Sequence, residues 1–166
     1  MLPQELVYGV VREAAAPTPG HQWAVGDIYH CLRPYLEQRR LGRIWVSPID
    51  VVLDRERGLV VQPDVLVVLN PQLHLVTDRV WGAPDLVVEV MTPHLRIGTL
   101  DERLGRFAKY GVGECWLVRH LVDEFEIVSF GGGVIAERKV FAPHDRLQSR
   151  VLLDLAATPA EILTKL

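Results

Sequence analysis

Glu89 lies in the middle of an apolar stretch, residues 82–93 (GAPDLVVEVMTP), which predicts a loop, a buried strand and a second loop. Side chains alternate between the faces of a strand, so we expect Asp85, Val87 and Glu89 on one face and the even-numbered residues on the other. An ionised carboxylate is costly to bury unless it is paired with an opposite charge or binds a cation. Glu89 is therefore the first candidate for a functional residue.

A second acidic residue, Asp64, follows Pro63 at the head of another apolar run, as Asp85 follows Pro84. If the two strands are neighbours, Asp64 and Glu89 meet at one end of the sheet. Two carboxylates, a backbone carbonyl and water are the ligands that Mg²⁺ requires, and the ion can activate a water molecule and neutralise a phosphate oxygen. An aspartate after proline is also typical of a turn or a strand cap, so Asp64 and Asp85 can equally be structural.

The composition is that of a globular protein. The 166 residues are 49% hydrophobic and 23% charged, which fits one domain spanning residues 1–166. The sequence shows no signal peptide and no membrane-spanning run, so we expect a cytoplasmic protein without a membrane partner. Its net charge of −3 argues against strong nonspecific DNA binding without excluding DNA as a partner. The two cysteines are far apart and predict neither a zinc site nor a disulfide framework.

The elements that must position these acids alternate between strands and helices. Hydrophobic periodicity and turn residues predict a hairpin over 5–13 and helices over 21–39, 100–110 and 159–166. Gly42 is expected to end the first helix. The predicted strands cover residues 43–47, 49–53, 59–69, 114–119, 124–130, 134–141 and 146–153, besides the strand that carries Glu89. This order favours an α/β sheet with a helix against each face.

Several of these segments together resemble a known family. The segments are Pro63-Asp64 with its apolar run, Ala-Pro84-Asp85-Leu-Val-Val-Glu89-Val, Thr92-Pro93, and a helix that ends in Tyr110-Gly-Val-Gly-Glu-Cys-Trp. They resemble the restriction-endonuclease family that is common in cyanobacteria and other bacteria and belongs to the PD-(D/E)XK nuclease superfamily. The resemblance extends from about residue 5 to residue 155. It implies a restriction-endonuclease-like mixed β-sheet flanked by helices, with an additional β-hairpin region after residue 119.

The resemblance also implies roles for single residues. Asp64 would be the first metal ligand, Glu89 the second, and Val90 would offer its backbone carbonyl to Mg²⁺ or Mn²⁺. Asp85 would be a motif position that serves either as a ligand or as support for the strand end. The lysine of the superfamily is replaced by Met91 at its usual place, and the family's alternative lysine position on the following helix holds Arg103.

Arg103 can hold charge or orient water, but an arginine does not lose its proton and cannot replace a lysine that acts as a base. The resemblance adds His21 and Glu5 as site candidates, although a histidine at a helix start is more often a cap or a surface group. His94, Arg96 and Arg106 can contact phosphates, and we favour an ordinary solvated face for them.

Two functions from different classes follow from the sequence. The first is a metal-dependent DNA endonuclease, which by analogy with the superfamily leaves a 5′-phosphate and can act as a homodimer with two sites facing two strands. The second is a relative that has lost catalysis at Arg103 and uses the same fold for binding or assembly. A purely structural role for the acids is a third alternative.

Overall fold

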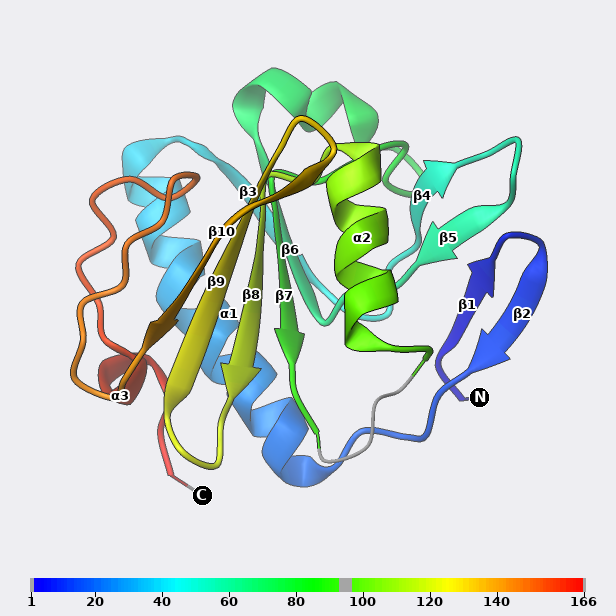
Figure 1. Cartoon of the computed structure of the whole chain (residues 1–166). Helices are drawn as coiled ribbons and strands as arrows, with labels where there is room; N and C mark the ends of the chain where they lie inside the picture. Colours follow the sequence, from blue (N-terminus) through cyan, green and yellow to red (C-terminus); the bar gives the residue numbers. More distant parts are fainter. Residues whose placement is uncertain (1, 93–96, 166) are drawn as a thin grey trace.

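The computed structural model describes residues 2–92 and 97–165, and its strands form two sheets (Figure 1). The strands are β1 (Gln4–Val7), β2 (Val10–Glu13), β3 (Gly42–Val46), β4 (Val51–Asp54), β5 (Leu59–Val61), β6 (Val65–Leu69), β7 (Leu86–Val90), β8 (Glu114–Arg119), β9 (Glu124–Gly131) and β10 (Val134–Phe141). The helices are α1 (Pro19–Arg39), the 3-10 helix η1 (Asn70–Leu75), α2 (Leu100–Tyr110) and α3 (Pro159–Ile162). None of the described helices has the length and apolar character needed to cross a membrane.

The larger sheet has six strands in the order β10-β9-β8-β7-β6-β3, and the smaller sheet has the order β2-β1-β5-β4. In the larger sheet β7 and β8 are parallel, while the other neighbouring strands are antiparallel. Helix α1 covers one face of this sheet and α2 the other (Figure 1). The predicted restriction-endonuclease-like mixed sheet flanked by helices is confirmed, and the hairpin after residue 119 is β9–β10.

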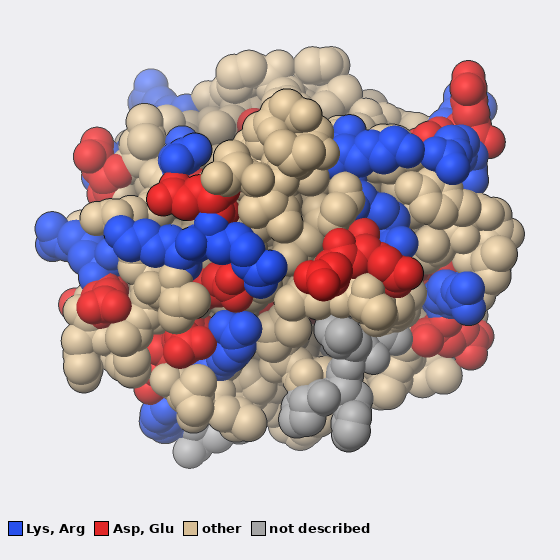
Figure 2. Space-filling view, viewed as in Figure 1, with Lys and Arg blue, Asp and Glu red and all other residues tan. Residues whose placement is uncertain are grey.

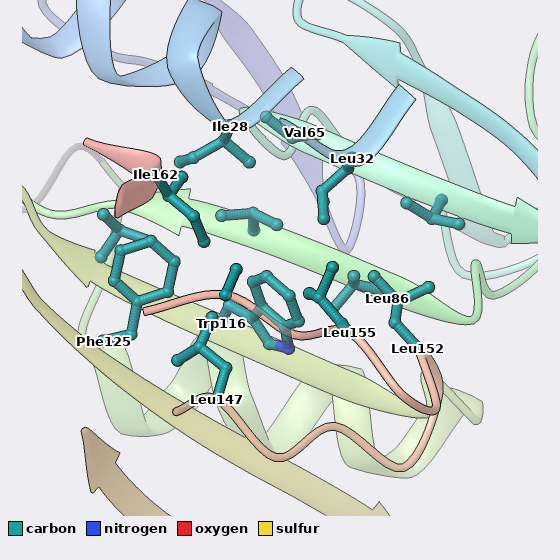
Figure 3. Packing of buried hydrophobic residues seen from close by; sticks show 14 of the residues in the cluster. Ile28, Leu32, Val65, Leu86, Trp116, Phe125, Leu147, Leu152, Leu155 and Ile162 are labelled. Carbon is teal, nitrogen blue, oxygen red and sulfur yellow. The ribbon is translucent and has the colours of Figure 1, made fainter. Parts of the chain in front are cut away.

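Apolar side chains fill the space on both faces of the larger sheet. Figure 3 shows part of the α1 side, where Ile28 and Leu32 of the helix pack over Leu86 and Trp116 of the strands. On the opposite face Val87 packs among residues of α2. The alternation predicted for β7 is therefore confirmed, because its successive residues belong to the two different cores.

The helix ends follow local capping rules. The Thr18 hydroxyl accepts a hydrogen bond from the backbone N–H of His21 and so caps the start of α1. The prediction that Gly42 ends this helix is wrong, because Arg40 takes the left-handed cap conformation and Gly42 begins β3. A side chain at Gly42 would meet the Val68 carbonyl of the neighbouring strand, so glycine allows the two strands to approach closely.

Three further predictions are corrected by the structure. The run over residues 59–69 is two strands in different sheets, because Pro63 has no N–H to donate and the chain changes sheet at this point. Residues 146–153 form no strand; the buried Glu114 carboxylate accepts hydrogen bonds from the Ser149 hydroxyl and the Arg150 N–H and fixes this segment as a loop. The last helix ends at Ile162, and residue 166 lies outside the described residues.

Candidate active site

Asp64 and Glu89 lie beside each other where β6 begins and β7 ends. The strands are antiparallel with Val65 opposite Val88, so one step further along the same register places Asp64 opposite Glu89. The Asp64 carboxylate is buried and accepts a hydrogen bond of 2.8 Å from the Val90 N–H. The structure therefore brings together the three residues that the sequence predicts as metal ligands.

His21 contacts the same carboxylate oxygen as the Val90 N–H. As the third residue of α1, its side chain is directed at the sheet by the helix start, and its Nε2 lies 3.1 Å from Asp64 Oδ2. Both side chains are 2% exposed. Hydrogen bonds from the His21 imidazole and the Val90 backbone amide fix the orientation of the Asp64 carboxylate at this end of the sheet.

Arg103 joins Glu89 to a third carboxylate, that of Glu5. Its Nε donates to Glu89 across 2.7 Å, and its two terminal nitrogens donate to the two Glu5 oxygens across 2.7 and 2.9 Å. The backbone N–H of Gln62 donates to Glu5 as well, across 2.7 Å. A bidentate guanidinium–carboxylate pair of this kind is strong and directional, so Arg103 is a fixed part of the site.

Among the described residues that line the cavity next to Arg103, carboxylates outnumber guanidinium groups. Glu5, Asp64, Glu89 and Arg103 line one small cavity of about 50 Å³ at the end of β7. Burial raises the pKa of Glu89, Arg103 opposes this rise and the nearby Asp64 and Glu5 carboxylates reinforce it, so that the pKa is about 7. The Glu89 and Glu5 carboxylates raise the pKa of Arg103 despite its burial, which keeps the guanidinium charged.

These residues fit a divalent cation in chemistry, though not as a complete cage. Carboxylate and carbonyl oxygens are the donors that Mg²⁺ prefers, and Asp64, Glu89 and the Val90 backbone at this cavity are donors of this kind. Within residues 2–92 and 97–165, no three His, Cys, Asp or Glu side chains are grouped as a metal site. An ion here would depend on Asp64, Glu89, the Val90 carbonyl and water molecules, with Arg103 retained beside it.

Asp85 is not part of this group. It precedes β7 and lies four residues from Glu89, which in a strand is about 13 Å. Its carboxylate accepts hydrogen bonds from the Leu69 N–H across 2.7 Å and from the Gln72 amide across 3.2 Å. The structure thus places Asp85 at the opposite end of the strand, where it supports the turn from β6 into η1.

The other candidates differ in how far the sequence indicated them. Glu5 has the signal of a charged residue inside a predicted strand, whereas Gln62 carries no signal in the sequence and enters the site through its backbone. Arg106 lies on α2. Two hydrogen bonds with Thr99 lower the pKa of Glu102, and the charge of Arg106 lowers it further. His94 and Arg96 lie outside the described residues.

Comparison with known proteins shows the family and several chains of similar fold in solved structures. The model of the Uma2 family, described as "Putative restriction endonuclease", matches residues 2–160. A crystal structure titled as that of a "putative nuclease belonging to DUF820" from Anabaena variabilis superimposes with a TM-score of 0.81. The two chains are 14% identical, and the match covers 96% of this chain and 88% of the other. At this identity the likeness shows the fold. No curated protein matches the sequence.

Proposed function

Because the chain belongs to the Uma2 family, we propose that it is a nuclease of the PD-(D/E)XK type that hydrolyses DNA phosphodiester bonds with Mg²⁺ or Mn²⁺. One observation carries the proposal: Asp64, Glu89 and the Val90 backbone face one cavity from neighbouring strands, and their oxygens are donors of the kind that Mg²⁺ prefers. Asp64, Glu89 and the Val90 carbonyl would hold the ion. Asp85 is left out of this ligand set.

The residues around the candidate site each have a defined part in this proposal. A bound Mg²⁺ supplies a Lewis acid that lowers the pKa of water and neutralises charge on a phosphate oxygen. His21 and the Val90 N–H keep the Asp64 carboxylate in position. Arg103 stays protonated and so does not accept a proton from water; it holds Glu89 and Glu5 in place.

The test is nicking of supercoiled plasmid DNA with Mg²⁺ or Mn²⁺. We expect wild type to nick the plasmid and Glu89→Ala to lose this activity. Glu37→Ala, which removes an exposed carboxylate on α1, is the matched control and should nick like wild type. Wild type that neither cleaves DNA nor binds either metal in calorimetry would refute the proposal. Light scattering of the same sample tests the proposed homodimer, and fractionation of the source cells tests the proposed cytoplasmic location.

The pairing of Arg103 favours a second candidate function, that of a relative which keeps the fold for binding or assembly without cleavage. Arg103 contacts both Glu5 and Glu89 at 2.7 Å, so the position of the lysine base is filled by a group that cannot exchange a proton. Arg103→Lys decides between the two functions. Cleavage gained only in Arg103→Lys would show that the natural site has lost catalysis, whereas cleavage by wild type would exclude this second function.

A further inference from the structure

A second and larger cavity, of about 600 Å³, adjoins the candidate active site. Glu5, Gln62 and Asp64 line both cavities, so the larger one lies against Asp64, one of the proposed metal ligands. Its walls come from the β1–β2 hairpin, the start of α1 and the segment between β3 and β4, which are far apart in sequence. Figure 1 shows the hairpin beside the lower end of α2, at the edge of the molecule. We call this cavity the side pocket.

The walls of the side pocket combine apolar surface with amide groups. The apolar part is formed by Leu6, Val11, Pro17, Val25, Pro48 and Val60, while Gln22 and Gln62 add groups that can both donate and accept hydrogen bonds. Pockets for small ligands are usually apolar concavities of this size with a few polar groups that fix orientation. A neutral, flat group with a polar edge, such as a nucleobase, suits these walls.

The charged groups on the walls of the side pocket are mostly acidic and do not favour phosphate in its interior. Its lining contains the carboxylates of Glu5, which Arg103 pairs, of Asp64, which His21 contacts, and of Asp50, and Arg79 is the one guanidinium among the described lining residues. Arg79 is 3.8 Å from Asp50 and its side chain is 41% exposed, which places its positive end within reach of solvent. A nucleotide would therefore enter base first and leave its phosphate outside.

A surface with arginines around an aromatic ring continues from Arg79, and Asp78 pairs there with Arg79 and accepts a hydrogen bond from the Trp81 indole. The Arg79 guanidinium lies 5.5 Å from the Trp81 ring centre, and Arg55 lies 5.7 Å from the same ring. Trp81 is 37% exposed. Basic groups next to an exposed aromatic ring are typical of surfaces that track a single strand of nucleic acid.

We propose that the side pocket accepts one unpaired nucleotide of the DNA strand beside the bond to be cleaved, and that the adjoining strand passes over Arg79 and Trp81. A base inside a duplex is stacked and paired and cannot enter such a pocket. The substrate is therefore single-stranded or locally unpaired DNA. This inference rests on the proposed nuclease function, and the experiment separates the two.

The experiment compares two valines on opposite faces of β2. Val11 pairs with Leu6 and lines the side pocket, whereas Val10 pairs with Val7 and lies outside the pocket. Both valines are at least 50% exposed, so either can be replaced without disturbing a core. Val11→Trp fills the side pocket, and Val10→Trp adds the same bulk on the other face.

Binding is measured in EDTA, which prevents metal-dependent cleavage, with a fluorescein-labelled oligonucleotide of about 20 bases and its blunt duplex. We expect wild type and Val10→Trp to bind the single strand at least about tenfold more tightly than the duplex. Val11→Trp should lose this preference. Arg79→Gln should weaken single-strand binding and reduce its salt slope by about one, while Arg33→Gln on exposed α1 should not.

The outcomes distinguish failure of the side pocket from failure of the nuclease proposal. Equal binding of both oligonucleotides, no binding of either, or an unchanged preference in Val11→Trp overturns the pocket, even if wild type nicks plasmid DNA. If Val11→Trp removes a single-strand preference but the protein cleaves no DNA with any metal, the side-pocket proposal is supported and the nuclease proposal is refuted.

Discussion

Buried carboxylates lie at both ends of the parallel strands β7 and β8, but the groups that contact them differ between the two ends. Asp85 and Glu114 lie at the amino-terminal end, where β7 and β8 begin. Glu114 is 1% exposed and accepts hydrogen bonds from the Trp116 indole, the Ser149 hydroxyl and the Arg150 N–H. In the described part of the chain, no ion pair involves either of these two carboxylates. Neutral donors from the fold satisfy them.

At the carboxyl-terminal end of β7 the carboxylates lie around a cavity and share a charged donor. Arg103 is shared between Glu5 and Glu89, and Asp64 adds a further carboxylate to the same cavity. A carboxylate saturated by neutral N–H and O–H groups stabilises the fold and needs no further partner. Carboxylates that line a cavity together offer the oxygen donors that a cation site requires. The partners of each acid therefore distinguish support from candidate function.

Charge elsewhere on the surface does not add a strong field around this site. Figure 2 shows basic and acidic side chains next to each other over the face that carries α2. Several basic side chains of the larger sheet are paired: Arg119 and Arg138 both pair with Glu126, and Arg119 also pairs with Glu124. Long-range attraction of DNA to this face should accordingly be weak, and local contacts should decide binding.

The sharpest test of the comparison is Arg103→Met, which should give the largest effect. It leaves Glu5 and Glu89 buried without their guanidinium, and removing one partner of a buried pair costs about 3–5 kcal/mol. Urea unfolding measures the loss. Mg²⁺ should restore more stability in this variant than it adds to wild type, because the ion replaces the missing positive charge. Arg33→Met, at an exposed pair on α1, is the control and should change little. A loss of stability no larger than in the control would contradict the contrast between the two ends of β7.

The next effect is on activity alone. Asp64→Asn keeps an oxygen that can accept from Val90 but removes the charge that a metal requires. We expect plasmid nicking to fall by about 100-fold or more, while the thermal midpoint changes by only a few degrees. Nicking assays and thermal unfolding of the same preparation measure the two quantities. Nicking by Asp64→Asn at the wild-type rate would show that Asp64 is not a functional residue of the site.

The opposite outcome is expected for Glu114→Ala at the other end of the sheet. The change leaves the Trp116 indole and the Arg150 N–H without their buried acceptor, which costs about 2–3 kcal/mol. Urea unfolding should show this loss, and nicking per folded molecule should stay at the wild-type rate. Loss of nicking in a fully folded Glu114→Ala protein would contradict the separation of the two ends.

The smallest effect is expected for Asp85→Asn. The amide oxygen can still accept from the Leu69 N–H, so only the extra strength of a charged acceptor is lost, about 1 kcal/mol. Nicking should be unchanged, in contrast to the same substitution at Asp64. A loss of nicking by folded Asp85→Asn protein would show that Asp85 is one of the catalytic residues.

Much of the scaffold was predictable from local sequence rules. The helix over residues 100–110 has the predicted bounds because Thr99 and Glu102 form a capping box and Gly111 adopts a left-handed φ of 93°. The split of residues 59–69 between two sheets was not predictable, because strand pairing depends on partners elsewhere in the chain. The loop over 146–153 escaped prediction for a similar reason, since its anchor, Glu114, lies more than 30 residues away.

The sequence by itself determined that Glu89 lies within one strand and Asp64 at the head of another, because alternation along a strand and the position of Pro63 are local properties. That these two strands are neighbours was decided by the tertiary structure. Only the tertiary structure decided that Arg103 pairs with Glu5, 98 residues away, and that Asp85 belongs to the supporting end of β7. The physical reason is that the energy of a buried charge depends on which donors surround it in space. That environment is set when distant strands and helices pack together.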